Sequence, residues 1–189
     1  MAQLRMRWKN DGTPAVMPKL PPEVTFTAFP DTPDALNEWL DIVQYGLSET
    51  RREEDYYDRI MRKWRDYDEK LCFFLNVDGK PMATITVICH RAESDGYVHM
   101  VAARPEIRGR GYGNLLNEYA VYILKREGMA GAFLTTDDFR IPAIKSYLRM
   151  GFEPDKSTAG RNLTPEEEVA LAKDFDNRWD AIFKEIGRK

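Results

Sequence analysis

The feature that most limits how this chain can fold is a short turn rich in glycine and arginine. Its sequence is RGRGYG, residues 108–113. It lies between an apolar segment with the composition of a strand, residues 97–103, and an amphipathic segment with the periodicity of a helix, residues 111–127. Because glycine has no Cβ, the backbone N–H groups of this turn can approach a ligand closely. The order strand, turn and helix therefore predicts an α/β unit that binds a phosphorylated ligand where the helix starts.

The turn attracts anions in two ways. The first N–H groups of a helix have no partner inside the helix, and the helix dipole is positive at this end. The side chains of Arg108 and Arg110 add positive charge, so a diphosphate is the expected ligand; the alternative is a surface turn that binds nothing. Two other phosphate motifs are excluded. The dinucleotide fingerprint requires glycine where Asn114 stands, and the P-loop requires a Gly-Lys-Ser/Thr ending that is absent.

A second pattern, A-x-x-x-Y-x-x-x-G-F, follows at residues 143–152. The first pattern, R-x-x-G-x-G at residues 108–113 preceded by ARPE at residues 103–106, resembles the acyl-CoA-binding signature of the GCN5-related N-acetyltransferase (GNAT) superfamily. The second pattern resembles that superfamily's second signature. The resemblance is close over residues 70–155 and rests on element order alone over residues 24–69. It points to a bacterial small-molecule-type member.

The resemblance implies a fold of the α/β (α+β) class, in which a mixed, mostly antiparallel, twisted sheet is flanked by helices. It implies acetyl-CoA as the co-substrate and no metal. The implied reaction is transfer of the acetyl group to a primary amine of an unidentified acceptor, by direct attack in a ternary complex. The acceptor is either a small molecule or a peptide amine. A non-catalytic acyl-CoA-binding sensor of the same fold is the alternative.

The resemblance also assigns the cofactor to two segments. The pantetheine arm should pair with the strand at Val101, Ala102 and Ala103, as an additional strand would. The diphosphate should meet the following loop, whose predicted cofactor-binding residues are Arg108, Gly109, Arg110, Gly111, Tyr112, Gly113 and Asn114. The resemblance also implies a bulge in this strand, and a backbone N–H next to it, near Met100 or Val101, should stabilise the carbonyl oxygen as it gains charge.

Two side chains are predicted to be catalytic. Tyr147 would reprotonate the leaving thiolate, because a phenol with a pKa near 10 can supply that proton; the alternative is a core tyrosine on an apolar helix face. His99 would be the general base, because imidazole titrates in the useful range. Simple alternation places it on the strand face of Tyr97 and Val101. A hydrogen-bonded structural histidine and a water relay to Tyr97 or Glu118 are the alternatives.

Arg140 departs from the superfamily pattern, which often has asparagine seven residues before the tyrosine. It is included among the predicted cofactor-binding residues because its guanidinium suits a phosphate of CoA. Two alternatives stay open. It could orient a carboxylate of the acceptor, or it could form an ion pair with Asp137 or Asp138.

The pattern of elements predicts three parts. Residues 1–23 are an irregular lead-in that permits a short edge strand, residues 24–155 are the acetyltransferase domain, and residues 156–189 are a C-terminal helical extension. The extension, which replaces the β-hairpin usual in the superfamily, is expected to pack on its own domain; contact with a second subunit, and hence a homodimer, is the alternative.

Local signals mark several element ends. Asp78-Gly79 between two apolar runs predicts a β-hairpin. Thr32-Pro33 predicts a helix start, and capping boxes predict two more, at residues 50–53 and 164–167. The first two helices should wall the acceptor site. Acidic residues there could attract a cationic amine: Glu49, Glu53, Glu54 and Asp55.

Composition excludes several functional classes. Lys plus Arg is 28 and Asp plus Glu is 31, so the net charge of −3 gives no general attraction to nucleic acid or to an anionic membrane. No apolar run is long enough to span a membrane. Cys72 and Cys89 lie in apolar runs and are expected to be buried free thiols in a cytoplasmic protein. The two histidines and two cysteines lack the spacing of a metal site.

Overall fold

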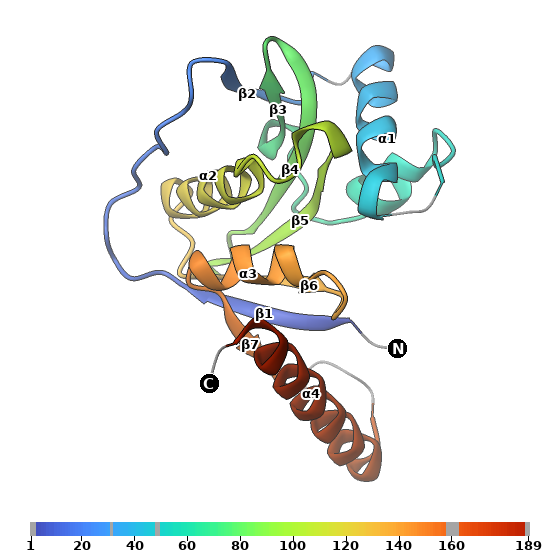
Figure 1. Ribbon diagram of the computed structural model, residues 1–189, viewed down its shortest axis with the longest axis vertical. Coiled ribbons are helices and arrows are strands. Elements are labelled where there is room, and N and C mark those ends of the chain that lie inside the picture. The colour runs from blue at the N-terminus through green and yellow to red at the C-terminus, as the bar shows by residue number, and fades with distance from the viewer. Residues whose placement is uncertain (1–2, 31, 48–49, 158–162, 188–189) are drawn as a thin grey trace. The chain divides into compact units, whose positions relative to one another are not determined.

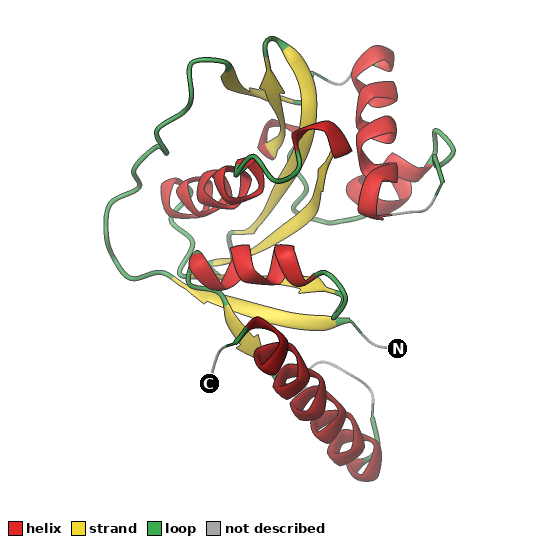
Figure 2. Ribbon diagram, in the orientation of Figure 1, coloured by secondary structure: helices red, strands yellow, loops and turns green. Residues whose placement is uncertain are grey.

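The computed structural model describes residues 3–30, 32–47, 50–157 and 163–187. The chain divides into two compact units, Asn10–Ala132 and the combination of Met1–Lys9 with Phe133–Lys189. The described residues form seven strands and four α-helices, coloured by type in Figure 2. Strand pairing is mostly antiparallel, which confirms the predicted α/β (α+β) class. The domain boundaries predicted at residues 24 and 155 remain predictions.

The larger unit is built on four strands, each antiparallel to its neighbour, in the order β2-β3-β4-β5. Their bounds are β2 (Val24–Ala28), β3 (Cys72–Val77), β4 (Lys80–His90) and β5 (Asp95–Ala103). Between β3 and β4 the two turn residues, Asp78 and Gly79, have φ angles of 50° and 78°. Two successive positive φ angles are typical of a type I′ turn, so the predicted hairpin is confirmed.

Two helices cover opposite faces of these strands (Figure 1). They are α1 (Pro33–Leu47) and α2 (Tyr112–Arg126). Neighbouring residues of β3 alternate between them: the Phe73 ring meets Tyr119 of α2 at 5.1 Å, whereas Phe74 belongs to the cluster beneath α1. This alternation follows from the two-residue period of a strand. Both faces of the strands are therefore buried, and α1 supplies fully buried side chains, Trp39, Leu40 and Val43.

The helix start predicted at Thr32 is confirmed, because the Ala35 N–H donates to Thr32 Oγ1 over 3.3 Å. The capping box predicted at residues 50–53 is wrong. The next helical segment, η1 (Asp58–Arg62), begins further along and has no side-chain cap. Arg51, inside the predicted box, donates to Asn37 of α1 over 2.7 Å. A short 3₁₀ helix, η2 (Glu69–Leu71), then leads into β3.

Strand β5 contains a β-bulge. Thr84 stands opposite Ala102 and Thr86 stands opposite His99, so one residue of β4 faces two residues of β5, Met100 and Val101. Met100 has a φ of 51°, which is unusual for a residue other than glycine. The extra residue puts Ala102 on the same face as His99. The expectation that Val101 would share that face was wrong, because simple alternation ignores the bulge.

The smaller unit has strands in the order β6-β1-β7 and two helices. Their bounds are β6 (Gly131–Thr136, from Phe133 onward in this unit), β1 (Leu4–Lys9), β7 (Glu153–Asp155), α3 (Ile141–Arg149) and α4 (Pro165–Ile186). The lead-in predicted to be irregular therefore contains β1, whereas residues 10–23 have neither helix nor strand. β1 is also not an edge strand, because it lies between two others. Its apolar side chains are buried, Leu4, Met6 and Trp8.

The C-terminal helix α4 starts with the predicted capping box. Glu167 N–H donates to Thr164 Oγ1 over 3.3 Å, and the Thr164 N–H donates to the Glu167 carboxylate over 2.8 Å. Its second half packs within the smaller unit through three buried side chains, Phe175, Trp179 and Ile182. Arg178 adds an ion pair to Asp138, at 2.9 Å, in the segment before α3. The helical extension thus packs on its own unit.

The position of β1 gives a test of the fold. Met6 is fully buried, and replacing a buried methionine by alanine typically costs about 2–5 kcal/mol of unfolding free energy. We expect Met6→Ala to lose that much in chemical denaturation. Lys9→Ala, at an exposed position of the same strand, should change the unfolding free energy by less than about 0.5 kcal/mol. Equal small losses in the two variants would mean that β1 is not a core strand.

Candidate functional site

The glycine-rich loop joins β5 to α2. After the 3₁₀ helix η3 (Pro105–Ile107), residues 108–111 form a turn, and α2 starts at Tyr112. Gly109 and Gly111 have φ angles of 76° and 86°, which side chains other than glycine rarely adopt. Ile107 is 3% exposed and anchors the loop in the larger unit. The loop conformation therefore depends on glycine at two positions and on one buried apolar contact.

Five consecutive N–H groups of the loop are available to a ligand. Arg108 N–H donates to the Pro105 carbonyl over 3.1 Å, and Asn114 N–H donates to the Gly111 carbonyl over 3.0 Å. Of the seven loop residues predicted to bind the cofactor, Arg108 and Asn114 therefore use their N–H groups in hydrogen bonds inside the loop. The N–H groups of residues 109–113 make no hydrogen bond with any residue in the described part of the chain. These are the N–H groups that the sequence predicted would bind an anion, and their role toward a ligand stays a prediction.

The space above the glycines is open. A Cβ built at Gly109, Gly111 or Gly113 would meet no atom within 4 Å. Positive φ angles explain the first two glycines, but Gly113 has no positive φ and lies in the first turn of α2. Glycine there costs about 1 kcal/mol of helix stability relative to alanine. The fold alone does not require Gly113, whereas the close approach of a ligand would.

Tyr112 and the two arginines play different parts. The Tyr112 side chain is 8% exposed, and its hydroxyl donates to Glu23 over 3.0 Å. This hydrogen bond is the main reason that the pKa of Tyr112 is raised. Only the N–H of Tyr112 can therefore face a ligand. Arg108 and Arg110 are exposed, and Arg108 Nη2 donates to the Ala103 carbonyl over 3.2 Å.

The end of β5 presents its peptide groups alternately to β4 and away from it. Arg104 N–H donates to the Met82 carbonyl of β4 over 2.9 Å, and Ala102 stands opposite Thr84. In an antiparallel pair, every second residue bonds to the partner strand. The peptide groups of Ala102 therefore face β4, and those of Ala103 face away. Of Ala102 and Ala103, only Ala103 therefore turns its peptide groups away from β4, and Arg108 contacts its carbonyl.

His99 is buried in an aromatic environment. It is 8% exposed, its Nε2 lies 3.2 Å from the Ile60 carbonyl, and its ring lies edge-on to Trp64 with centroids 6.0 Å apart. Nε2 donates in this contact, so Nδ1 is the unprotonated nitrogen. Burial is the largest cause lowering the pKa of His99, to about 4. A base this weak is poorly matched to proton abstraction near neutral pH, so the environment favours the alternative of a structural histidine.

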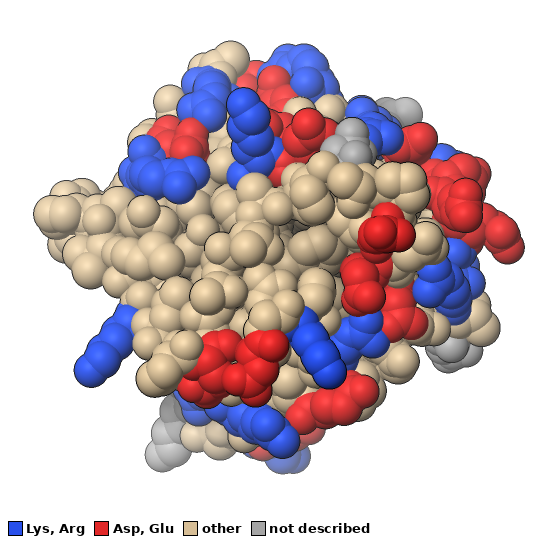
Figure 3. Space-filling view, turned by 90° about the horizontal axis from the view of Figure 1, so that it is seen from above, with Lys and Arg blue, Asp and Glu red and all other residues tan. Residues whose placement is uncertain are grey.

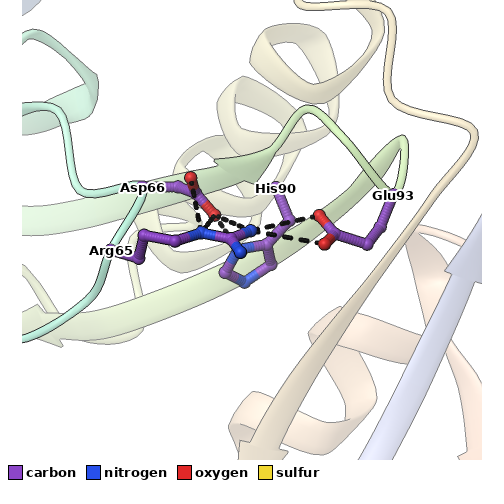
Figure 4. A network of polar contacts seen from close by, with 4 residues as sticks. All are labelled: Arg65, Asp66, His90 and Glu93. Atoms are coloured by element: carbon purple, nitrogen blue, oxygen red, sulfur yellow. Dashed lines mark hydrogen bonds and ion pairs between the residues drawn. The ribbon is translucent and has the colours of Figure 1, made fainter.

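A polar network holds the segment that carries Trp64 against the strands (Figure 4). His90, at the end of β4, lies 2.8 Å from the Asp66 carboxylate. Arg65 bonds to Asp66 at 2.9 Å and to Glu93 at 3.3 Å. The hydrogen bond from Arg65 is the main reason that the pKa of Asp66 is lowered to about 2. The network thus helps to fix the tryptophan that covers His99.

The smaller unit contains the other two predicted site residues. Tyr147 lies on α3 and is 7% exposed, with its ring 6.1 Å from that of Phe152. Arg140 Nε lies 2.9 Å from the Asp137 carboxylate, which is the ion-pair alternative that the sequence left open. Its neighbour Asp138 is paired with Arg178 instead. The role of Arg140 toward a cofactor therefore stays a prediction.

Sequence reasoning gave no role to Arg104, which connects the loop to α1. Its Nη2 lies 2.8 Å from Glu38, its Nη1 contacts Asp41, and its Nε donates to the Pro81 carbonyl over 3.2 Å. The Arg104 side chain is only 17% exposed. No local pattern marks this residue, because its partners lie far away along the chain.

Other predictions about the site have mixed outcomes. Cys72 and Cys89 are buried free thiols, as predicted. Glu53 and Glu54 are exposed, Asp55 pairs with Arg59 at 2.9 Å, and Glu49 lies outside the described residues. On the face drawn in Figure 3, side chains of both charges are interspersed around an uncharged middle.

The described residues contain no group of three or more His, Cys, Asp or Glu side chains placed to hold a metal ion. No described helix has the length and hydropathy of a membrane span.

The low pKa of His99 gives a pH dependence of stability. An unfolded histidine has a pKa near 6.5, so the unfolded chain binds the additional proton between pH 6.5 and 4. The contribution of His99 is thus fully present above pH 6.5 and is lost as the pH falls toward 4, by up to roughly 3 kcal/mol. We expect the difference in unfolding free energy between wild type and His99→Gln to narrow over that range. A constant difference would contradict a neutral, buried His99.

Comparison with known proteins agrees with the arrangement of strand, loop and helix. The sequence profile of the family described as "Acetyltransferase (GNAT) family" matches residues 34–152. A mycothiol acetyltransferase from Streptomyces avermitilis is 29% identical over 154 residues, which cover 78% of this chain. An uncharacterized N-acetyltransferase from Methanocaldococcus jannaschii is 26% identical over 149 residues, 72% of this chain. The chain spans 49% and 64% of the lengths of these two proteins.

Solved structures share the fold. A GCN5-related N-acetyltransferase from Sphaerobacter thermophilus aligns with a TM-score of 0.65 and 20% identity, over 80% of this chain and 48% of that one. The ribosomal-protein-S18-alanine N-acetyltransferase from Escherichia coli aligns with a TM-score of 0.57 and 20% identity, over 75% of this chain and 99% of that one. Since the profile covers more than half of the sequence, the chain belongs to the GNAT family of acetyltransferases.

Proposed function

We propose that the protein is an N-acetyltransferase that moves the acetyl group of acetyl-CoA to a primary amine. The observation that carries this proposal is the run of five unpaired N–H groups at residues 109–113, in open space at the start of α2. A helix start binds phosphate through such groups. A diphosphate carries enough oxygens to accept from several of them at once, and CoA contains one.

The neighbouring strand supplies the second part of the cofactor site. The peptide groups of Ala103 face away from β4, which suits pairing with the amide groups of a pantetheine arm. The bulge at Met100 disturbs the regular ladder next to this edge. A backbone N–H turned out of the ladder at a bulge is the proposed donor to the thioester oxygen, because a preorganised donor stabilises the negative charge that develops there.

The proposed chemistry is direct attack. The amine nitrogen, once deprotonated, attacks the thioester carbonyl carbon, the C–S bond breaks, and the departing thiolate takes a proton. Tyr147 is the proposed donor of that proton, on the strength of its place in the second signature. His99 remains the proposed base only if its pKa in the complex is well above the value of about 4 that its burial produces. Otherwise it positions the segment around Ile60.

The acceptor is proposed only as a class. The relatives include a mycothiol acetyltransferase and an enzyme that acetylates the alanine of ribosomal protein S18, so both small molecules and protein N-termini belong in the search. The link between α1 and η1, which is expected to help line the acceptor site, carries both charges, because Arg51 and Arg52 precede Glu53 and Glu54. Charge alone therefore does not select between the two kinds of acceptor.

An amine-panel assay tests the proposal. Purified protein is incubated with acetyl-CoA and small amines, lysine peptides or peptides with an N-terminal alanine, and free thiol is measured. Thiol release that depends on one class of amine supports the proposal. Acetyl-CoA binding without release across the panel would favour a sensor. A thermal-shift response to ATP or NAD but not to CoA would contradict the cofactor assignment itself.

Replacement of Gly113 should separate stability from binding. Alanine removes the cost of a helical glycine, so we expect Gly113→Ala to raise the unfolding free energy by about 0.5–1 kcal/mol. Its Cβ would project toward the diphosphate, and overpacking typically costs 1–3 kcal/mol, so CoA affinity should fall roughly tenfold. Asn177→Ala, at an exposed position of α4, should stabilise the helix without changing the CoA affinity. Unchanged CoA affinity in Gly113→Ala would place the diphosphate elsewhere.

Removal of the Tyr147 hydroxyl should affect turnover and not binding. Because general acid catalysis typically contributes 10²–10⁴-fold, kcat in Tyr147→Phe should fall by roughly 100-fold or more. The Kd for acetyl-CoA, measured by calorimetry, should stay within about twofold. Tyr122→Phe serves as the matched control, since no role is assigned to Tyr122. A Tyr147→Phe enzyme with the wild-type kcat would remove the tyrosine from the mechanism.

A further inference from the structure

The Arg108 side chain folds back from the loop onto the end of β5. Its Nη2 donates to the Ala103 carbonyl over 3.2 Å. The same nitrogen lies 3.7 Å from the position that a Cβ would take on Gly46, at the kink near the end of α1. The guanidinium therefore lies between the kink in α1 and the end of β5, over a peptide group that faces away from β4.

Two partners compete for this arginine. If the pantetheine arm pairs with β5 as proposed, an amide of the arm needs the Ala103 carbonyl to which Arg108 donates. The phosphates of CoA would lie beside the N–H groups of residues 109–113, directly after Arg108 in the chain. A guanidinium binds phosphate more strongly than it binds a neutral carbonyl, because that hydrogen bond is charge-assisted.

We propose that Arg108 determines specificity, by making the site select CoA thioesters over pantetheine thioesters without phosphate. This inference rests on the proposed function. A ligand with phosphates offers Arg108 a better partner, and the Ala103 carbonyl is uncovered as the arginine moves. A ligand without phosphates has to break the contact between Arg108 and Ala103 and offers the guanidinium no new hydrogen-bond acceptor. The arginine thus favours one ligand and opposes the other.

Removal of Arg108 should change the affinities for CoA and for pantetheine in opposite directions and by different factors. Loss of a charge-assisted hydrogen bond costs about 1.5–3 kcal/mol, so removal of Arg108 should weaken CoA binding roughly tenfold or more. The hydrogen bond from Arg108 to the Ala103 carbonyl is exposed and its acceptor is uncharged, so it contributes less free energy than a bond to phosphate. Its removal should strengthen pantetheine binding by about two- to fivefold.

Arg110 is the matched control. It is exposed, lies on the same loop, and makes no hydrogen bond with any residue that the structure describes. Arg110→Leu removes the same charge and adds the same apolar side chain as Arg108→Leu. Arg110→Leu leaves the hydrogen bond from Arg108 to the Ala103 carbonyl in place.

The experiment is a pair of NMR titrations of ¹⁵N-labelled protein, one with CoA and one with pantetheine, on wild type, Arg108→Leu and Arg110→Leu. Thermal unfolding of each variant confirms that it is folded. We expect both variants to bind CoA more weakly than wild type. Only Arg108→Leu should bind pantetheine more tightly, by the two- to fivefold given above.

Pantetheine affinity that is equal to or below that of wild type in Arg108→Leu would overturn the proposal, as would an absence of pantetheine binding by this variant. An equal gain in pantetheine affinity in Arg110→Leu would also overturn the proposal, because the gain would then come from the lost charge or the added apolar surface. If wild type failed to bind CoA, the proposed function itself would fail, which is a distinct result.

Discussion

The structure around the candidate site depends on one constraint: the start of α2 has backbone N–H groups that no part of the described chain satisfies. Every helix begins with unpaired donors, and most proteins cap them with a side chain. Here Gly111 stands at the cap position with a left-handed conformation and no side chain to offer. The residues around it leave the donors accessible, which is the arrangement that a bound anion requires.

The rest of the larger unit holds this loop in place. The Tyr112 hydroxyl donates to Glu23, the residue before β2, and Ile107 is buried. Arg104 forms ion pairs with two carboxylates of α1. These contacts fix both ends of the loop before any ligand arrives. A preorganised loop binds without the entropy cost of ordering. The contacts of Arg104 also connect α1 with the glycine-rich loop within the larger unit.

Local chemistry decided which features could be predicted from sequence. The Asp78-Gly79 turn and the capping box at Thr164 were confirmed, because a few neighbouring residues determine each. The helix start predicted at Thr50 was wrong, since the helical segment begins further along the chain. The edge-strand prediction failed because pairing of β1 with β7, which is far away in the sequence, is not encoded locally. The resemblance implied a bulge near Met100, which is present, but simple alternation ignored it, so the face shared by His99 and Ala102 was missed. For the loop, glycine spacing predicted a turn with accessible N–H groups, while the partners of Tyr112, Arg108 and Arg104 emerged only from the tertiary structure.

The most direct test of the account is an amide NMR titration of ¹⁵N-labelled wild-type protein with CoA. If the diphosphate accepts from the loop, the amide protons of residues 109–113 should move downfield and saturate together. The amide protons of Arg108 and Asn114, which already bond to carbonyls inside the loop, should move less. Saturable CoA binding that leaves residues 109–113 unshifted while other parts of the chain respond would contradict the central claim.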